Sequence, residues 1–312
     1  MPSNNVYVYP RLGRNDLGLI RFGGHGLANL MFCWANATCF AHKNGFPMIW
    51  PTWGQIKRLT LFGGFGDRRL YLNLFDRPGD AVTPIRGAVL RQFLSTTKLS
   101  PDSDLEDLAQ RLKQRVANEN RSHIAEFPAE WTQKVDFATL FDHHSFLKQQ
   151  LIKMRPNAFK KQESSAPIAI HVRLGDLPFD GSGVLRGEPV RSHARLPIEY
   201  YRRALNKVRN NHGENLNAWV YSDGTNEELK DLLSMHNVTR QNLDTAFDEM
   251  IAMSQSNYLI GSGSTFSKWA SFLSDGKTYW PPLLDHFQTK TRPELETEIL
   301  NPLRIQHQLA EQ

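Results

Sequence analysis

The chain has 312 residues, of which 40% are hydrophobic and 22% are charged, and these proportions predict a globular protein of about two domains. The 37 basic and 32 acidic residues leave a net charge of +5, which is too small and too dispersed to indicate nucleic-acid binding. A membrane span needs about 18 consecutive apolar residues, and no apolar run in the sequence is nearly that long. The first residues lack the apolar core of a secretion signal. We therefore expect a cytoplasmic protein, attached to the inner face of the membrane at most peripherally.

Near the N-terminus the sequence predicts a strand, a glycine turn and a helix. Apolar residues at 17–22 precede the GGHG turn at 23–26, whose glycines permit a tight backbone path. Apolar residues then recur at helical spacing over 27–41, and Gly45 is a typical C-cap. With a short strand at 47–53, this arrangement begins a β-α-β unit.

The cysteines and histidines predict neither a disulfide nor a metal site. Cys33 and Cys39 lie six residues apart in the predicted helix, so their side chains point to different sides and cannot easily bridge. The sequence contains no C-x-x-C pair and no cluster of histidines and cysteines. We expect both cysteines to be small buried side chains.

The rest of the first half is less regular and ends at a predicted domain boundary. Residues 54–100 have glycine turns and aromatic residues without a clear period, whereas 104–121 and 138–155 are predicted as helices. A stretch rich in proline, serine and charge follows. We therefore expect an N-terminal lobe over 1–155 and a linker over 156–167.

In the second half predicted strands alternate with predicted helices, a pattern typical of parallel β-α-β units. We expect a C-terminal lobe over 168–290 and a tail over 291–312 that packs back on the N-terminal lobe. The predicted strands are 168–172, 217–223, 258–264 and 278–282, and the predicted helices are 196–211, 226–236, 246–257 and 265–275.

Three of these strands end in polar residues. Because the carboxyl ends of parallel strands lie at one edge of a sheet, and ligands bind there, we expect these residues to form one site. They are His171, Arg173 and Asp176 after the first strand, Ser222 and Asp223 after the second, and Gly261 to Thr265 after the third.

The third cluster, GSGST, runs directly into a predicted helix. Free backbone N–H groups and the helix dipole favour an anion at such a position, and the hydroxyls of Ser264 and Thr265 add donors. The alternative is that one of these two residues is simply the N-cap of the helix.

Arg173 is the natural second half of a phosphate clamp, because a guanidinium group pairs with two phosphate oxygens at once. The alternative for Arg173 is a structural ion pair with Asp176 or Asp223. Asp223 itself would accept from a nucleotide base or ribose, or from a loop amide. The sequence contains no Walker loop, no dinucleotide fingerprint and no nucleophile elbow.

Five stretches, in the correct order, resemble motifs of the fucosyltransferase superfamily, above all the α-1,2-fucosyltransferases of glycosyltransferase family 11. HVRLGD at 171–176 resembles the family's H-V-R-R-G-D, and GLANLMF at 26–32 resembles its G-L-G-N-Q-M-F opening. The other three stretches are LPIEYYRRAL (196–205), VYSDG (220–224) and MSQSNYLIGSGSTFSKWASFL (253–273).

This resemblance implies a GT-B fold, in which two Rossmann-like α/β lobes with parallel sheets enclose a cleft. It implies that the C-terminal lobe binds the nucleotide sugar and the N-terminal lobe binds the acceptor. The implied reaction is an inverting, metal-independent transfer of L-fucose from GDP-fucose to a glycan hydroxyl. The expected partners are thus a nucleotide-sugar donor and a glycan acceptor, with no metal and no other cofactor, whereas the oligomeric state is not indicated.

The resemblance also implies roles for individual residues. Arg173 would hold the β-phosphate and His171 would lie beside the nucleotide. An inverting transfer needs a general base, and Asp176 and His25 are the candidates, although Asp176 would otherwise fix Arg173 and His25 would otherwise be an ordinary loop histidine. The remaining donor-binding positions are Asp223 at the guanosine, Gly263, Ser264 and Thr265 at the phosphate, and Gly24 and Asn29 across the cleft.

The motifs also depart from the family pattern at several positions. The family's second arginine is Leu174 here, its second aspartate is Gly224, its G-N-Q is Ala28-Asn29-Leu30, and the first tryptophan of its W-W is Lys268. The loss of a cation at 174 bears on which donor is recognised. Two alternatives are therefore open: a degenerate member that binds a nucleotide or glycan without transferring sugar, and a transferase that uses another nucleotide-deoxysugar.

Overall fold

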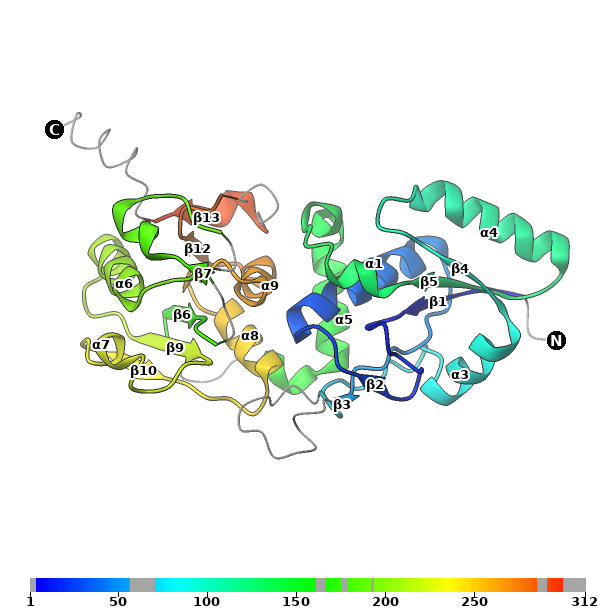
Figure 1. The fold of residues 1–312 in the computed structure, drawn as a ribbon, viewed down its shortest axis with the longest axis horizontal. Helices are drawn as coiled ribbons and strands as arrows, with labels where there is room; N and C mark the ends of the chain where they lie inside the picture. The colour runs from blue at the N-terminus through cyan, green and yellow to red at the C-terminus, as the bar shows by residue number, and fades with distance from the viewer. Residues whose placement is uncertain are drawn as a thin grey trace. The chain divides into compact units, whose positions relative to one another are not determined.

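The computed structural model describes residues 4–56, 71–160, 166–175, 179–191, 194–284 and 291–299. The chain divides into two compact units, one formed by Met1–Val135 and Asp142–Asn157 and the other by Asp136–Phe141 and Ala158–Gln312. Each unit has helices around a parallel β-sheet (Figure 1). The predicted α/β class, with two lobes built on parallel sheets, is confirmed.

The first unit contains a three-stranded parallel sheet in the order β1 (Val6–Pro10), β5 (His123–Phe127) and β4 (Ser95–Lys98). All five residues of β1 and all five of β5 are buried, as expected for the central strands of a covered parallel sheet. Single parallel bridges extend the pairing beyond β1, from Val8 to Met48 and from Ile49 to Val82.

Helices cover both faces of this sheet. Helix α1 (Leu27–Asn44) packs Phe40 on Phe127, with ring centroids 5.4 Å apart, and ends at Gly45 as predicted. On the other face, α3 (Pro84–Phe93) packs on a cluster of Tyr7, Tyr9, Ile49 and Ile124. The other elements of the unit are β2 (Arg21–Phe22), β3 (Gln55–Ile56), α4 (Leu105–Glu119), η1 (Ala129–Thr132) and α5 (His144–Met154).

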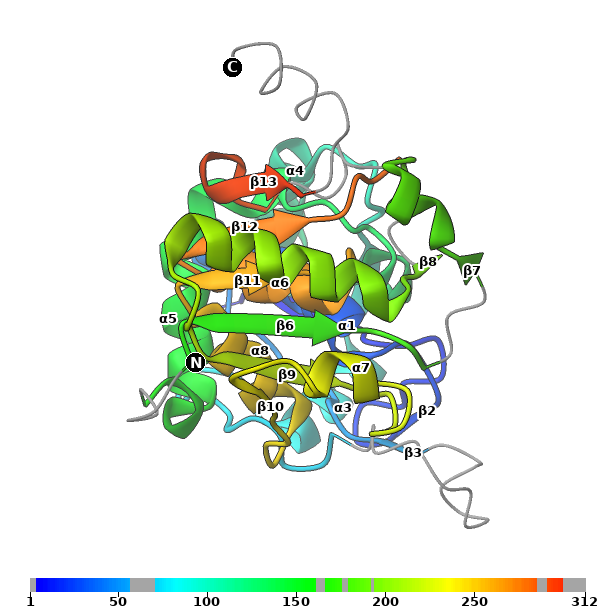
Figure 2. The same ribbon diagram turned by 90° about the vertical axis from the view of Figure 1, so that its left-hand side faces the viewer.

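The second unit contains a six-stranded parallel sheet in which β6, the first of its strands along the chain, lies in the middle (Figure 2). Numbered within the unit, the strand order is that of a doubly wound Rossmann sheet, with the reversal of direction between β6 and β11. The strands, from edge to edge, are β10 (Val238–Arg240), β9 (Ala218–Ser222), β6 (Ile168–Val172), β11 (Tyr258–Ile260), β12 (Lys277–Trp280) and β13 (Glu296–Glu298).

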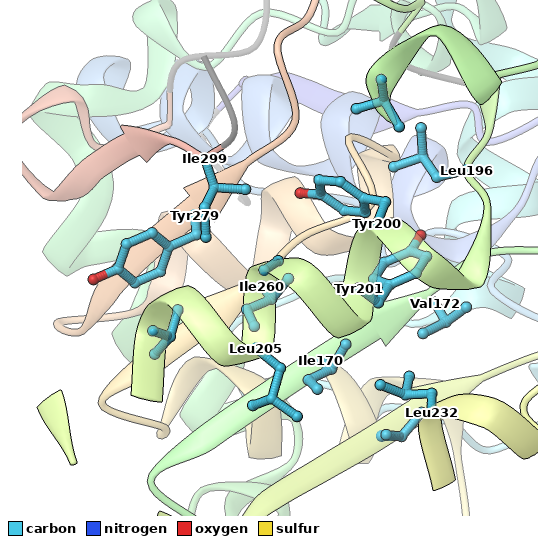
Figure 3. Close-up of a cluster of buried hydrophobic side chains, with 14 of the residues drawn as sticks. Ile170, Val172, Leu196, Tyr200, Tyr201, Leu205, Leu232, Ile260, Tyr279 and Ile299 are labelled. Carbon is cyan, nitrogen blue, oxygen red and sulfur yellow. The ribbon is translucent and has the colours of Figure 1, made fainter. Parts of the chain in front are cut away.

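Helices α6 (Ile198–His212) and α7 (Lys230–Leu233) lie on one face of this sheet, and α8 (Ala246–Ser254) and α9 (Thr265–Leu273) lie on the other (Figure 2). Tyr200, Tyr201 and Leu205 of α6 belong to one buried apolar cluster with Ile170 and Val172 of β6 (Figure 3). This packing fixes the position of β6 and so of the residues that follow it.

Two predictions about the elements are wrong. The first strand is β1, because the stretch 17–22 contributes only the two residues of β2 to strand pairing. Most of the predicted helix 226–236 is turn, and α7 covers Lys230–Leu233. At 296–298 the predicted tail forms β13, which pairs with β12, and its polar sequence gives no apolar alternation from which an edge strand could be predicted. The packing of the tail on the N-terminal lobe stays a prediction.

Cys33 and Cys39 are buried free thiols in α1, as predicted. Within the described ranges, the structure has no helix long and apolar enough to cross a bilayer.

Candidate functional site

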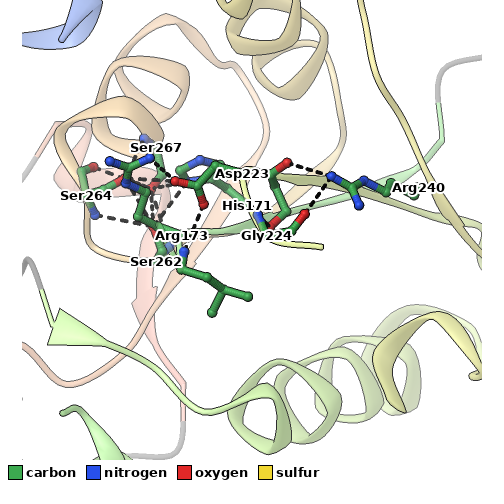
Figure 4. Close-up of polar contacts among 10 residues, drawn as sticks. His171, Arg173, Asp223, Gly224, Arg240, Ser262, Ser264 and Ser267 are labelled. Atoms are coloured by element: carbon green, nitrogen blue, oxygen red, sulfur yellow. Dashed lines mark hydrogen bonds and ion pairs between the residues drawn. The ribbon is translucent and has the colours of Figure 1, made fainter. Parts of the chain in front are cut away.

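The carboxyl ends of β6, β9 and β11 bring the three predicted polar clusters side by side (Figure 4). β6 pairs with β9 on one side and with β11 on the other, so His171, Asp223 and the residues after Ile260 lie at one edge of the sheet. This edge contains the topological switch point between β6 and β11, where ligands bind in open α/β sheets. The site is therefore built by the strand order.

His171 is hydrogen-bonded to a group of serine hydroxyls at the start of α9. Its Nδ1 lies 3.1 Å from both Ser262 Oγ and Ser267 Oγ and 3.4 Å from Ser264 Oγ. The side chain is 6% exposed. Burial lowers the pKa of His171 to about 4, with a smaller lowering by Arg173 that Asp223 opposes. The imidazole is thus neutral at pH 7 and orients the hydroxyls without adding charge.

The buried neutral state of His171 predicts a pH-dependent stability. The unfolded histidine, with a pKa of 6.5, binds a proton before the folded one does, so stability is lost as the pH falls from about 6.5 towards about 4. The loss should reach about 3 kcal/mol. Urea unfolding at a series of pH values measures it, and the variant His171→Asn should show a flatter profile over this interval. An identical pH profile in the variant would contradict the assignment.

Helix α9 begins with a side-chain cap that is part of the same network. The Ser264 hydroxyl accepts a hydrogen bond from the Ser267 amide, so the N-cap alternative for Ser264 is confirmed. Gly263 has a φ of 76°, a left-handed conformation that favours glycine, and it turns the chain from β11 into the helix. Ser267 was not predicted as a site residue, although its position three residues after the N-cap is a signal that could have identified it.

Arg173 and Asp223 form an ion pair between the ends of β6 and β9. Asp223 Oδ1 also accepts a hydrogen bond of 2.9 Å from the Leu174 amide. The two side chains are 22% and 31% exposed, so an incoming anion has access to the pair. The structural alternative for Arg173 is thus present, and it holds the guanidinium group at the ligand edge of the sheet. Contact of Asp223 with guanosine stays a prediction.

Leu174 points away from this polar edge. It is 2% exposed and packs in the same cluster as Val172 on the α6 face, as expected from the alternation of side chains along a strand. A Cβ atom at Gly224 would lie 2.5 Å from Leu174 Cδ1. The departures from the family motifs at 174 and 224 are therefore in contact with each other, and they affect the same packing.

This contact makes Gly224→Ala a specific prediction. The added methyl group should overlap Leu174 and destabilise the chain by about 1–3 kcal/mol, as other overpacked cores do. Chemical unfolding measures the loss, and Leu174→Ala in the same chain should recover part of it by making room. If the double variant loses as much free energy of unfolding as the two single variants lose together, the two positions are not coupled.

Gly24, His25 and Asn29 lie in the first unit, around the start of α1. The glycine turn before α1 is held by Arg21, which is fully buried and donates to the Gly23 carbonyl oxygen over 3.1 Å. Burial, followed by the charges of Arg21 and Arg14, lowers the pKa of His25. Its imidazole is therefore neutral at pH 7 and able to accept a proton.

Asp176, the other candidate base, lies outside the described residues. In the part of the chain that the structure describes, no group of three or more histidine, cysteine, aspartate or glutamate side chains could hold a metal ion.

A doubly wound sheet with an arginine and a helix start at its carboxyl edge has the arrangement in which α/β proteins bind anionic ligands. Residues 105–281, more than half of the chain, match the model of glycosyl transferase family 11. The chain therefore belongs to glycosyl transferase family 11 and is a glycosyltransferase. The resemblance of its motifs to that family is confirmed.

Comparison with curated proteins finds no match to the chain. Among solved structures, POFUT1 in complex with GDP is similar, with 13% sequence identity, a TM-score of 0.49, and coverage of 91% of this chain and 100% of that chain. The NodZ α-1,6-fucosyltransferase soaked with GDP-fucose has 13% identity, a TM-score of 0.42, and coverage of 87% and 93%. The fucosyltransferase NodZ from Bradyrhizobium has 11% identity, a TM-score of 0.39, and coverage of 87% and 94%.

Proposed function

We propose that this glycosyltransferase transfers L-fucose from GDP-fucose to a hydroxyl group of a glycan, with inversion at the anomeric carbon and without a metal ion. The observation that carries the proposal is the placement of Arg173, partly exposed, two residues after the His171 that is bonded to the start of α9. The motif resemblance supports fucose as the sugar, because the best-matched stretches surround this site.

The chemistry needs the groups that this edge supplies. The acceptor oxygen attacks the anomeric carbon, the bond from that carbon to the β-phosphate oxygen breaks, and the electron pair stays on the GDP that leaves. Arg173, the first amides of α9 and the hydroxyl of Thr265 would stabilise the charge that develops on the phosphate. The neutral His171 would keep the serine hydroxyls oriented beside it.

The acceptor hydroxyl loses its proton during the attack, and a base must take it. His25 and Asp176 are the two residues that we propose for this role. The lowered pKa of His25 keeps its imidazole in the form that accepts a proton at neutral pH. Substituting each residue separately and comparing the pH dependence of kcat distinguishes them, because only loss of the base removes the acidic limb of the profile.

A thermal-shift panel of GDP, UDP, CMP and dTDP, each measured with and without excess EDTA, tests the donor class. A ligand that binds only the folded protein stabilises it by about 2.7 kcal/mol at a concentration of 100 times its Kd. We expect GDP to raise the melting temperature and the other three nucleotides to have little effect. A response to UDP alone would contradict GDP-fucose as the donor, and a GDP response that EDTA abolishes would contradict metal independence.

A further inference from the structure

Arg240, at the end of β10, holds the loop that carries Asp223 (Figure 4). Its Nη2 donates to the carbonyl oxygens of Ser222 and Gly224, over 3.2 and 2.8 Å, and its Nη1 donates to Asn226 Oδ1 over 2.6 Å. Two of these acceptors stand directly before and after Asp223 in the chain. One guanidinium group therefore fixes the backbone on both sides of that carboxylate.

Asp223 connects the loop held by Arg240 to the carboxyl edge of the sheet, where ligands are expected. Its carboxylate forms the ion pair with Arg173 and accepts from the Leu174 amide. A Cβ atom at Gly175 would overlap the same carboxylate, so the carboxylate occupies the space that a larger residue at 175 would fill. On the opposite side of the loop, Leu174 packs on Gly224. The loop is thus held between Arg240 and the end of β6.

We infer that Arg240 is a positioning residue for Arg173, acting through the 222–226 loop and Asp223. This inference rests on the proposed role of Arg173 at the donor phosphate. Stabilisation of charge in a transition state depends on donors that are held within about 0.5 Å of their working position. The Arg173 side chain is long and partly exposed, so its direction depends on where Asp223 is held.

A double-mutant cycle tests the inference. It compares the effect of Arg240→Ala on kcat/KM for GDP-fucose in the wild-type background and in the Asp223→Ala background. Arg240→Ala should lower kcat/KM about 10- to 100-fold in the wild-type background. In the Asp223→Ala background the same change should have less than about a twofold effect, because the connection is already broken. Arg240→Lys, which keeps the charge and loses the planar fork, should recover only part of the loss. Equal effects of Arg240→Ala in both backgrounds would overturn the inference.

Arg209 offers a matched control at the other end of the same strands. It donates to the carbonyl oxygens of Leu216 and His236, over 2.8 and 2.7 Å, and these residues stand before β9 and β10. Arg209→Ala therefore removes the same kind of backbone contact at the amino edge of the sheet. It should lower the melting temperature and leave kcat at a permissive temperature unchanged.

A spectroscopic readout separates this inference from the proposed function. In arginine-labelled protein, the side-chain NMR signal of Arg173, assigned by its absence in Arg173→Lys, should shift or broaden in Arg240→Ala and stay unchanged in Arg209→Ala. If that result is found and the wild-type protein does not turn over GDP-fucose, the positioning role stands and the proposed function fails. An Arg173 signal unaffected by Arg240→Ala overturns the positioning role, whatever the turnover.

Discussion

Arg173→Ala is expected to lower kcat/KM for GDP-fucose by about 10²- to 10³-fold, the usual effect of removing one donor from a site of developing negative charge. Arg173 follows β6 at the carboxyl edge of the second sheet, in an ion pair with Asp223. Release of GDP from GDP-fucose, with and without a panel of glycan acceptors, measures the effect. The folded state should be retained, since this partly exposed ion pair contributes little to stability.

The controls for this prediction come from the same unit. Arg173→Lys keeps the positive charge but loses the bidentate geometry, so its activity should fall between those of the wild type and Arg173→Ala. Arg203→Ala removes an exposed arginine of α6 that pairs with Glu199, and it should leave turnover unchanged. Near-normal activity of Arg173→Ala would rule out the phosphate role.

The second large effect is expected in the first unit, where Arg21→Met should destabilise the fold by about 3–5 kcal/mol. Arg21 is fully buried and donates to the carbonyl oxygens of Gly23, Thr52 and Trp53 and to Gln55 Oε1. Methionine fills a similar volume, so the lost free energy of unfolding comes mainly from the oxygen atoms that no longer receive a hydrogen bond from Arg21. Urea unfolding, with hydrogen exchange of the first unit, measures it.

A control variant is available close by in the sequence. Arg14 is exposed, and Arg14→Ala should change the free energy of unfolding by less than about 0.5 kcal/mol. If Arg21→Met were equally neutral, the hydrogen bonds of Arg21 would not be what holds the glycine turn in place.

Strong apolar patterns allowed much of the second unit to be predicted from the sequence. The bounds of β6 are correct at both ends, and α9 and β9 are correct within two residues at each end. In the first unit β5 is missed, because His123 and Glu126 interrupt its apolar run although all five residues are buried. These polar side chains are accommodated by tertiary contacts, His123 with Thr97 and Glu126 with Arg11 3.6 Å away, which no local pattern reveals.

The convergence of the three polar clusters follows from parallel topology, and so it could be predicted from alternating strands and helices. The ion pair of Arg173 with Asp223 was one of two alternatives that the sequence left open. The contact of Arg240 with the 222–226 loop could not be predicted, because it joins separate strands and no local pattern reveals it. The direction of Leu174 was accessible in principle, since alternation along the strand places it with Val172.

The direction of Leu174 changes what the departures from the family motifs at 174 and 224 mean. The sequence alone suggests that Leu174 removes a cation from the donor site. In the structure Leu174 is buried in the apolar cluster on the α6 face and packs on Gly224. Arg173, Asp223 and the serines occupy the other side of this edge, which weakens the case for a degenerate protein.

We propose that this edge of the second sheet activates GDP-fucose for transfer. The most direct test is to incubate the protein in EDTA with GDP-fucose, GDP-mannose, UDP-glucose or dTDP-rhamnose and a mixture of glycans, and to measure release of the nucleoside diphosphate. We predict release of GDP from GDP-fucose, with little release from the other three donors. Release from UDP-glucose or dTDP-rhamnose, with GDP-fucose left intact, would contradict the claim.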